Sequence, residues 1–420
     1  MEPDLPFAPS YRAEKEVEIG DNPVKTIGAF TRRFTPITDP RPQQRGWRFE
    51  LTKALPALTS FAAVRLTGVV MATLWSLHLG RHPRTVFGLE WDGRWYWHIS
   101  QYGYGLIVHG KGGHSVYNDL AFFPLFPGLI RAVSTVLPIG PVNVALLIAW
   151  SAALVAAWGV YAIGELLHGR RVGIILVTLW ALLPHAIILT MAYTEPLMTA
   201  FAAWSLHAVL TRRWLTAGAL AALAGLCRPN GLAVAVAVVT GAVAHLWQLR
   251  RTDEPTAPRA WAAAVMAPLG WLGYLGWVGL RTHNPAGYFH VQSLWGSRFD
   301  FGHYTAHMFR HLIVGHDTLV VYATAAIILG SLLLFVFCAL NGQPLALLAY
   351  CAVLIVMAVG GAHFFTSKPR FLLPAFPLLL PLAVHLARSH LRTIVVLLTA
   401  SAGVSLFYGT YLLTVSHRAL

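Results

Sequence analysis

Apolar residues form long runs along most of this chain, and short polar segments separate each run from the next. A helix needs about twenty mostly apolar residues to cross the hydrocarbon core of a bilayer. Eleven runs between residues 55 and 415 approach that length, although the runs at 196–210, 214–226 and 344–360 are shorter. The pattern therefore predicts an all-α polytopic membrane protein with about 11 transmembrane helices.

One further apolar run, at 121–137, contains Pro124, Pro127 and Arg131. If this run crossed the membrane, every later loop would change sides. Basic residues mark the cytosolic side of a membrane protein. Four basic blocks follow this run, at 168–171, 212–213, 250–259 and 388–392. They lie on the same side as the basic N-terminal segment only if the run does not cross the membrane. We therefore expect 121–137 to be a juxtamembrane helix on the outer surface, which leaves Arg418 outside, against the trend.

The remaining organisation follows from this orientation. Residues 1–54 are polar at first and lack the apolar core of a signal peptide, so we expect a cytosolic N-terminal tail. Residues 55–416 form the transmembrane domain. Its two large outer loops are expected at 80–141, with juxtamembrane helices, and at 282–316.

Composition supports the membrane class and excludes others. The 420 residues are 56% hydrophobic and 11% charged, with a formal net charge of +14. The positive charge lies in short blocks between apolar runs, which indicates membrane orientation and not nucleic-acid binding. Cys227, Cys338 and Cys351 have apolar neighbours and no metal-binding spacing, so we expect small core residues without disulfides. The 19 histidines are scattered, and we expect no metal site.

Single acids and bases stand beside proline, glycine or aromatic residues at the ends of runs, in five segments expected on the outer side. They are Asp92, near Trp91 and Trp95, with Asp119; Glu195; Arg228 and Asn230; Gln292 and Trp295; and Lys368 with Arg370. Ionisable groups buried at span ends are typical of functional sites. Structural roles are also open, namely helix caps, a Glu195–Arg228 ion pair, lipid headgroup contacts and an interfacial aromatic belt.

Carboxylates together with cations suit displacement at a sugar carbon whose leaving group is a lipid-linked phosphate. A carboxylate can take the proton of the attacking hydroxyl as a general base. Arginine or lysine can stabilise the charge that the departing phosphate gains. A long lipid tail would lie in a groove between spans, which explains why such chemistry would occur in a membrane protein.

Several motifs in order resemble a known family. They are Trp91-Asp92 with Gly103-Tyr104, the segment from Asp119 to Pro127, Tyr193-Thr194-Glu195, Arg228-Pro229-Asn230-Gly231, and Arg370-Phe371 leading to Pro374 and Pro377. Together they resemble the PIG-V-like mannosyltransferases of the GT-C glycosyltransferase superfamily, whose members use polyprenyl or dolichyl phosphate sugars. The compact sequence looks like a bacterial member. The resemblance implies a GT-C-type helix bundle, a cytosolic N-terminus and an extracytoplasmic active site in the plasma membrane.

The resemblance also implies roles for the outer residues. Asp92 is expected to be the catalytic base, and the donor phosphate is expected to contact Lys368, Arg370 and Arg228. Substrate-positioning roles are expected for Asp119, Glu195, Asn230, Trp91, Trp95, Gln292 and Trp295. Asp119 stands where eukaryotic members often have glutamate, which favours positioning over proton transfer.

The expected reaction is inverting transfer of mannose from polyprenyl-phosphate-mannose to a hydroxyl of a glycan, glycolipid or protein. No cofactor is required, because the basic residues can neutralise the phosphate, and a role for a divalent cation is left open. The expected partners are the lipid bilayer, the lipid-linked sugar and the acceptor, without nucleic acid. Two other functions are consistent with the spans: a transporter or lipid flippase without transfer activity, and a non-catalytic scaffold.

Overall fold

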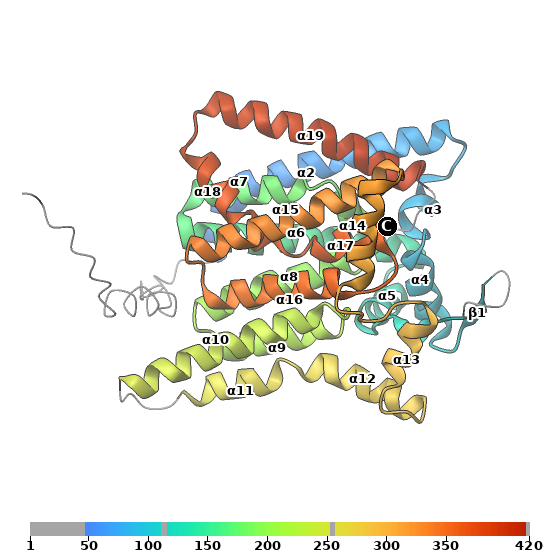
Figure 1. Cartoon of the computed structure of the whole chain (residues 1–420), viewed down its shortest axis with the longest axis horizontal. Helices are drawn as coiled ribbons and strands as arrows, with labels where there is room; N and C mark the ends of the chain where they lie inside the picture. The colour runs from blue at the N-terminus through green and yellow to red at the C-terminus, as the bar shows by residue number, and fades with distance from the viewer. Residues whose placement is uncertain (1–46, 111–115, 253–256, 417–420) are drawn as a thin grey trace, which may run out of the picture.

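Helices lying side by side form almost the whole molecule (Figure 1). The computed structural model describes residues 47–110, 116–252 and 257–416. Most of the expected N-terminal tail and Arg418 lie outside these residues. The first described helix, α2, begins at Trp47, within the segment expected as a tail.

Within the described residues, six helices are long and apolar enough to cross a membrane, or seven if one bent pair counts as a single span. The expected number of about 11 is not confirmed. The six spans comprise α2 (Trp47–His78), α6 (Pro141–His168), α10 (Gly231–Arg251), α11 (Pro258–Met266) continued by α12 (Leu269–Arg281), α15 (Leu319–Leu340) and α19 (Leu391–Thr414).

Shorter apolar helices account for the difference in number. They are α7 (Arg170–Ala181), α8 (Glu195–Leu210), α9 (Trp214–Gly225) and α16 (Leu345–Gly360). Helices of 12 to 16 residues are short for a full crossing. Most of α8 is buried by other helices, so protein covers its short apolar length.

The bent pair lies between the last two spans. Its segments, 365–372 and 376–388, meet at an angle of 77°. The pair comprises the 3₁₀ turn η3 (Phe365–Ser367), α17 (Lys368–Leu372), the 3₁₀ turn η4 (Phe376–Leu379) and α18 (Leu380–Arg388). Pro374 and Pro377 cause the break, because proline has no N–H for the helical hydrogen-bond ladder.

Carbonyl groups freed at this bend are bound by side chains of neighbouring helices. The indole N–H of Trp180 donates to the Leu373 carbonyl at 2.9 Å, and the Tyr350 hydroxyl donates to the Pro374 carbonyl at 3.0 Å. The Gln343 amide donates to Pro377 at 3.4 Å. These bonds satisfy buried backbone groups and hold the bend in place.

One end of the bundle carries short helices and loops. They are α3 (Pro83–Gly88), α4 (Asp92–Tyr102), the 3₁₀ turn η1 (Asp119–Ala121), α5 (Leu125–Val136), α13 (Gly287–Leu294) and α14 (His303–Val314). The apolar run at 121–137 thus contains a helix of 12 residues, too short to cross a bilayer. The sequence did not predict the antiparallel strands β1 (Ile107–His109) and β2 (Val116–Asn118), in which Val108 faces Tyr117.

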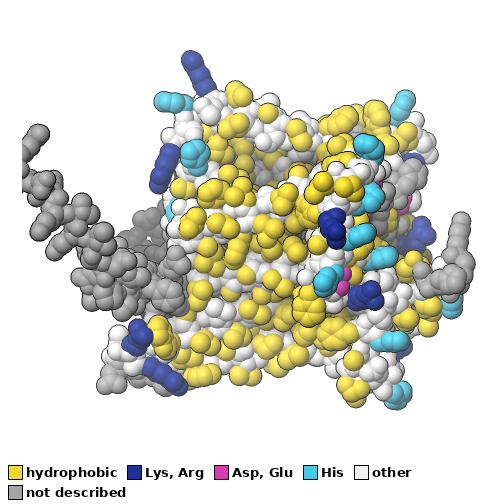
Figure 2. All heavy atoms as spheres, viewed as in Figure 1, with side chains coloured by type: hydrophobic (Ala, Val, Ile, Leu, Met, Phe, Trp, Pro, Cys, Tyr) yellow, Lys and Arg dark blue, Asp and Glu magenta, His cyan; other side chains and the backbone are white. Residues whose placement is uncertain are grey.

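Charge is segregated along the bundle. Figure 2 shows an apolar surface over the middle of the helices, with Lys and Arg side chains toward both ends. At the end opposite α3, α4 and α5, the Arg171 guanidinium donates to the Ser389 carbonyl at 3.1 Å, which joins the start of α7 to the end of α18 (Figure 1). Two of the predicted basic blocks therefore meet at one end of the bundle. The remaining 3₁₀ turn is η2 (Ala186–Thr190).

Candidate active site

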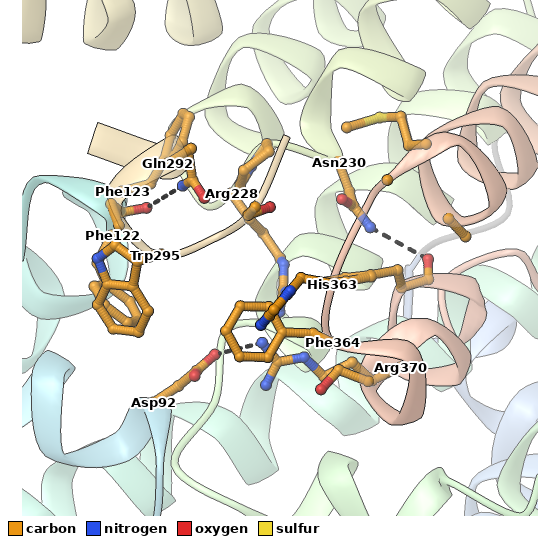
Figure 3. Close-up of a pocket in the computed structure, with 18 of the residues that line it drawn as sticks. Asp92, Phe122, Phe123, Arg228, Asn230, Gln292, Trp295, His363, Phe364 and Arg370 are labelled. Atoms are coloured by element: carbon orange, nitrogen blue, oxygen red, sulfur yellow. Dashed lines mark hydrogen bonds and ion pairs between the residues drawn. The ribbon is translucent and has the colours of Figure 1, made fainter. Parts of the chain in front are cut away.

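A pocket of about 520 Å³ opens at the end of the bundle that carries α4 and α13 (Figure 3). Segments far apart in the sequence meet there: the start of α4, the turn before α10, the end of α13 and the start of α17. Its acidic and basic lining residues are Asp92, Arg228, Arg298, His363, Lys368 and Arg370. Cations outnumber acids in this lining, which favours an anionic ligand.

Local backbone geometry places Asp92 in the pocket. Trp91, the residue before α4, has a φ of 44°, an unusual conformation that turns the chain into the helix. A Cβ atom on Gly93 would lie 2.5 Å from the Gly88 carbonyl oxygen, so only glycine fits there without a shift. The backbone N–H of Asp92 donates to the Tyr193 hydroxyl oxygen at 3.4 Å. The Asp92 carboxylate thus projects from a fixed helix start.

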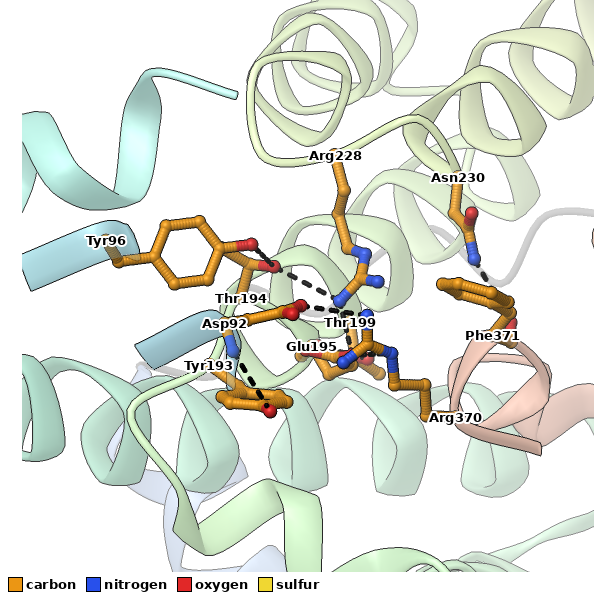
Figure 4. Close-up of polar contacts among 10 residues, drawn as sticks. All are labelled: Asp92, Tyr96, Tyr193, Thr194, Glu195, Thr199, Arg228, Asn230, Arg370 and Phe371. Atoms are coloured by element: carbon orange, nitrogen blue, oxygen red, sulfur yellow. Dashed lines mark hydrogen bonds and ion pairs between the residues drawn. The ribbon is translucent and has the colours of Figure 1, made fainter. Parts of the chain in front are cut away.

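Two acids and two arginines form a chain of alternating charges beside the pocket (Figure 4). An Nη2 atom of Arg370 lies 2.8 Å from Oδ2 of Asp92, and its Nε lies 3.6 Å from Oε1 of Glu195. Arg228 forms an ion pair with the same Glu195 oxygen. The two negative and two positive formal charges cancel. Buried ionised side chains in proteins are usually paired in this way. Glu195 is 1% exposed and Asp92 17%, so Asp92 is the more accessible acid.

Neutral polar and aromatic groups support this charged chain. The Thr194 hydroxyl accepts from Nη1 of Arg228 at 3.2 Å and lies 3.1 Å from the Tyr96 hydroxyl. Burial, with the nearby Asp92 charge, raises the pKa of both Tyr96 and Tyr193, so both phenols stay neutral. They therefore act as hydrogen-bonding groups in this site.

Some donors of the two arginines make no hydrogen bond. Within the described part of the chain, Nη1 of Arg370 and Nε of Arg228 make none, and Nε of Arg370 has only its ion pair with Glu195. The Phe371 ring lies 5.2 Å from the Arg370 guanidinium carbon and 5.5 Å from that of Arg228. Buried donors without partners are rare in folded proteins. A phosphate, which offers several oxygens, would supply the missing acceptors.

Lys368 borders the same pocket but its amine is engaged elsewhere. Its Nζ donates to Thr305 Oγ1 at 2.9 Å and to the carbonyls of Ala358 at 2.7 Å and Gly361 at 2.6 Å. An ammonium group has three donors. These contacts use its donors to join α17, α14 and the end of α16, so this arrangement does not place Lys368 in the charged chain.

Asp119 and Asn230 hold backbone segments in place. Asp119 is fully buried, and its Oδ2 accepts from the N–H groups of Gly105 and Leu106, both at 2.8 Å. The Asn230 amide donates to the Phe371 carbonyl at 3.2 Å, which ties the turn before α10 to α17. Asn230 borders the pocket, and Asp119 does not.

Aromatic side chains form one wall of the pocket. Trp95 stacks on Phe122 with ring centroids 5.5 Å apart, and Trp295 packs against both. The Trp295 indole donates to the Asn118 carbonyl at 3.1 Å, and the Gln292 amide donates to Ala121 at 3.3 Å. Trp91 also borders the pocket. Four of the residues expected to position substrate, Trp91, Trp95, Gln292 and Trp295, therefore line the pocket.

Four residues in or beside the pocket were not selected from the sequence, namely Tyr96, Tyr193, Arg298 and His363. Tyr96 follows Trp95 directly, and Tyr193 precedes the selected Glu195, so their motifs were recognised without a role for either side chain. Arg298 and His363 lie in loops without a distinctive motif. Their position in the pocket lining depends on how the loops fold.

All three cysteines are free and buried in this structure. Among the residues described, no group of three or more His, Cys, Asp or Glu side chains is arranged to hold a metal ion.

Fold and pocket define an integral, multi-pass helical membrane protein with a charged cavity at one end of its helices. No protein-family model matches the chain, and no curated protein sequence does. Its fold is similar to that of ArnT from Cupriavidus metallidurans in the apo state, at 12% identity over 71% of this chain and 58% of that one, with a TM-score of 0.45.

Two structures from Archaeoglobus fulgidus are also similar. The oligosaccharyltransferase AglB, in complex with an inhibitory peptide and a dolichol-phosphate, is 13% identical over 84% of this chain and 55% of that one, with a TM-score of 0.43. The apo oligosaccharyltransferase is 14% identical over 85% and 55%, with a TM-score of 0.45. This chain spans a little over half the length of these proteins.

Proposed function

We propose that this protein is a membrane glycosyltransferase that transfers mannose from a polyprenyl-phosphate donor to an acceptor hydroxyl. The observation that carries the proposal is the contact between Asp92 and Arg370 at the edge of a pocket. This acid and this cation are far apart in the sequence. General-base and phosphate-binding groups are thereby adjacent, as displacement at a sugar phosphate requires. The motifs that resemble PIG-V-like enzymes contain these same residues.

Arg370 has two roles in this proposal. In the structure it forms an ion pair with Asp92 through Nη2, which holds the carboxylate at the edge of the pocket. Arginine is well suited to bind phosphate, and Nη1 of Arg370 makes no hydrogen bond in the described part of the chain. The donor phosphate can therefore attract Arg370 away from Asp92. The Asp92 carboxylate is then free to contact the acceptor hydroxyl.

The proposed chemical step uses the two substrates, Asp92 and the two arginines. The acceptor O–H proton moves to a carboxylate oxygen of Asp92, and the acceptor oxygen forms a bond to the anomeric carbon with inversion. The bond from that carbon to the phosphate oxygen breaks, and its electron pair leaves with the polyprenyl phosphate. The additional negative charge is stabilised by Arg370 and by Arg228, which Glu195 orients. The wall of Trp95 and Trp295 encloses the sugar.

Asp92→Asn tests the base. The substitution keeps the shape of the side chain but removes its ability to accept the proton, so mannose transfer from polyprenyl-phosphate-mannose should fall by about 10² to 10⁴-fold. Transfer is measured in detergent with radiolabelled donor, on variants whose elution profile and melting temperature match the wild type.

Glu90→Gln is the matched control, because Glu90 is an acid two residues earlier that pairs with Arg81 and does not border the pocket. Its activity should stay within about twofold of the wild type, as is usual away from an active site. A folded Asp92→Asn protein with normal turnover would refute the assignment of the base.

Transport is a second candidate function, and the bent pair is the observation that favours it. Transporters commonly place binding sites at interrupted spans. The purified wild-type protein, reconstituted in lipid vesicles, distinguishes the two functions. Movement of the lipid-linked sugar across the bilayer without any transfer to acceptors would support transport and contradict the proposed enzyme.

A further inference from the structure

A second cavity, of about 530 Å³, adjoins the pocket that holds Asp92. Arg298, Ala362 and His363 line both cavities, so these three residues form the wall between them. The far side of the second cavity is formed by the start of α14, with His303 and His307. Figure 2 shows His, Lys and Arg side chains gathered over this part of the surface. The proposed mechanism assigns no role to this cavity.

Backbone contacts fix the dividing wall. The N–H of Ala362 donates to the Arg298 carbonyl at 2.7 Å, and the N–H of Asp300 donates to the Gly360 carbonyl at 2.9 Å. Lys368 binds the carbonyl of neighbouring Gly361. The segments on both sides of the wall are therefore held together before any ligand binds, so the wall is a prearranged part of the site.

The histidines of the second cavity follow a helical spacing. His303, His307 and His311 are four residues apart on α14 and therefore lie along one face of that helix. The expectation that the histidines are merely scattered overlooked this ladder. Only the first two line the cavity, which leaves His311 outside it.

The hydrogen-bond donors of the cavity favour an anion. Asp300 is its acid, but the Asp300 carboxylate accepts from the N–H of Gly302 at 3.0 Å and of Tyr304 at 2.8 Å, at the start of α14. Arg298 makes no ion pair with any residue that the structure describes, and its side chain is exposed. One guanidinium and the imidazole N–H groups are thus available to a ligand, whereas each oxygen of the Asp300 carboxylate already accepts a hydrogen bond.

We infer that the second cavity binds an anionic group, a phosphate or a carboxylate, on the acceptor substrate. This inference rests on the proposed function, because it assigns one of the two adjoining cavities to the sugar donor and the other to the acceptor. The donor phosphate occupies the pocket beside Arg370. The acceptor binds with its anionic group near Arg298, His303 and His307, and its hydroxyl passes the wall toward Asp92. The preferred acceptor is therefore an acidic glycan or a phosphorylated glycolipid.

The test compares three acceptor probes: mannose 6-phosphate, glucuronic acid and mannose. Arg298→Gln and the double variant His303→Gln, His307→Gln should raise the KM for an anionic probe by about tenfold or more, because a charged hydrogen bond is lost. In the double variant, whose two histidines do not border the pocket beside Asp92, the KM for mannose and kcat should change less than twofold. The matched control is His311→Gln, on the same face of α14 but outside the cavity, which should behave as the wild type.

Preference between the first two probes distinguishes a phosphate from a carboxylate ligand. An equal rise in KM for mannose and for the anionic probes would indicate a structural effect and overturn the inference, as would unchanged values for all three. Binding of the same probes, measured by calorimetry on the solubilised protein, is independent of turnover. If anionic probes bind through Arg298 but no transfer occurs with any acceptor, the proposed enzyme fails while the anion site stands.

Discussion

Arg65 is a buried cation in the middle of a spanning helix, and no acidic residue in the described part of the chain pairs with it. It lies in α2 and is 6% exposed, and its Nε and Nη2 atoms have no hydrogen-bond acceptor among the described residues. A buried charge without a partner is costly, and such residues within membrane segments often have a function. Neither the charged chain nor the second cavity includes it.

Replacing Arg65 by methionine should stabilise the protein by about 1–3 kcal/mol, because it removes buried donors without partners and keeps a side chain of similar length. Thermal unfolding in detergent measures the change. Arg94→Met, at an exposed position of α4, is the control and should shift the free energy of unfolding by less than about 0.5 kcal/mol. A loss of stability in Arg65→Met would mean that Arg65 binds a stabilising partner, such as a lipid phosphate.

Among the residues selected from the sequence, the structure brings some together and engages others elsewhere, and their roles stay predictions. Asp92 and Arg370 were selected as an acid and a base beside aromatic residues or proline, and the structure places them in contact. Lys368 had the same kind of sequence context, yet its amine binds Thr305 and backbone carbonyls. That difference depends on where α14 and the end of α16 approach α17. A sequence contains no local signal for such an approach.

At the scale of elements, close helix packing depends on a few glycines. A Cβ atom on Gly270, near the start of α12, would lie 1.8 Å from the Ala222 carbonyl oxygen in α9. Gly273, one turn later in the same helix, has open space where a Cβ would lie. The two glycines therefore serve as a test site and its control.

Gly270→Ala should destabilise the protein by about 1–3 kcal/mol, because the added methyl group forces α12 away from α9. Gly273→Ala should be neutral or stabilising by up to about 1 kcal/mol, since alanine is the better helix former. Thermal unfolding of the two variants in the same detergent gives the comparison. Equal melting temperatures would show that α12 and α9 do not pack as closely as described.

Helix type and position were predictable from apolar runs, but the number of crossings was not. The run at 196–210 corresponds closely to α8, and the run at 344–360 to α16. A hydropathy pattern does not show whether such a helix faces lipid or is enclosed by protein, as α8 is. The small sheet of β1 and β2 has strands of three residues, too short for a periodic pattern.

At the scale of the whole molecule, the candidate site and two of the basic blocks lie at opposite ends of the bundle. Asp92, at the start of α4, is at one end, and the contact between Arg171 and Ser389 is at the other (Figure 1). Positive charge favours the cytosolic side, which predicts an extracytoplasmic site.

Cysteine labelling tests this orientation. The three native cysteines are buried, so a new cysteine at exposed His283 or exposed Arg251 should dominate the reaction with a maleimide. In intact cells, a membrane-impermeant maleimide should label His283→Cys and leave Arg251→Cys unlabelled until the membrane is opened. The reverse pattern would place the pocket in the cytosol.

The hydrogen bonds to the bend beside α17 limit how the site can move. Straightening the bend would break three of them together, from Trp180, Tyr350 and Gln343. Arg370 is therefore mounted on a rigid support, and its exchange between Asp92 and an incoming phosphate requires only rotation of a side chain. Rotation of one side chain is a smaller motion than a collective movement of helices, which takes microseconds to milliseconds. In the proposed reaction, turnover would then be governed by the entry and exit of the lipid and not by rocking of the bundle.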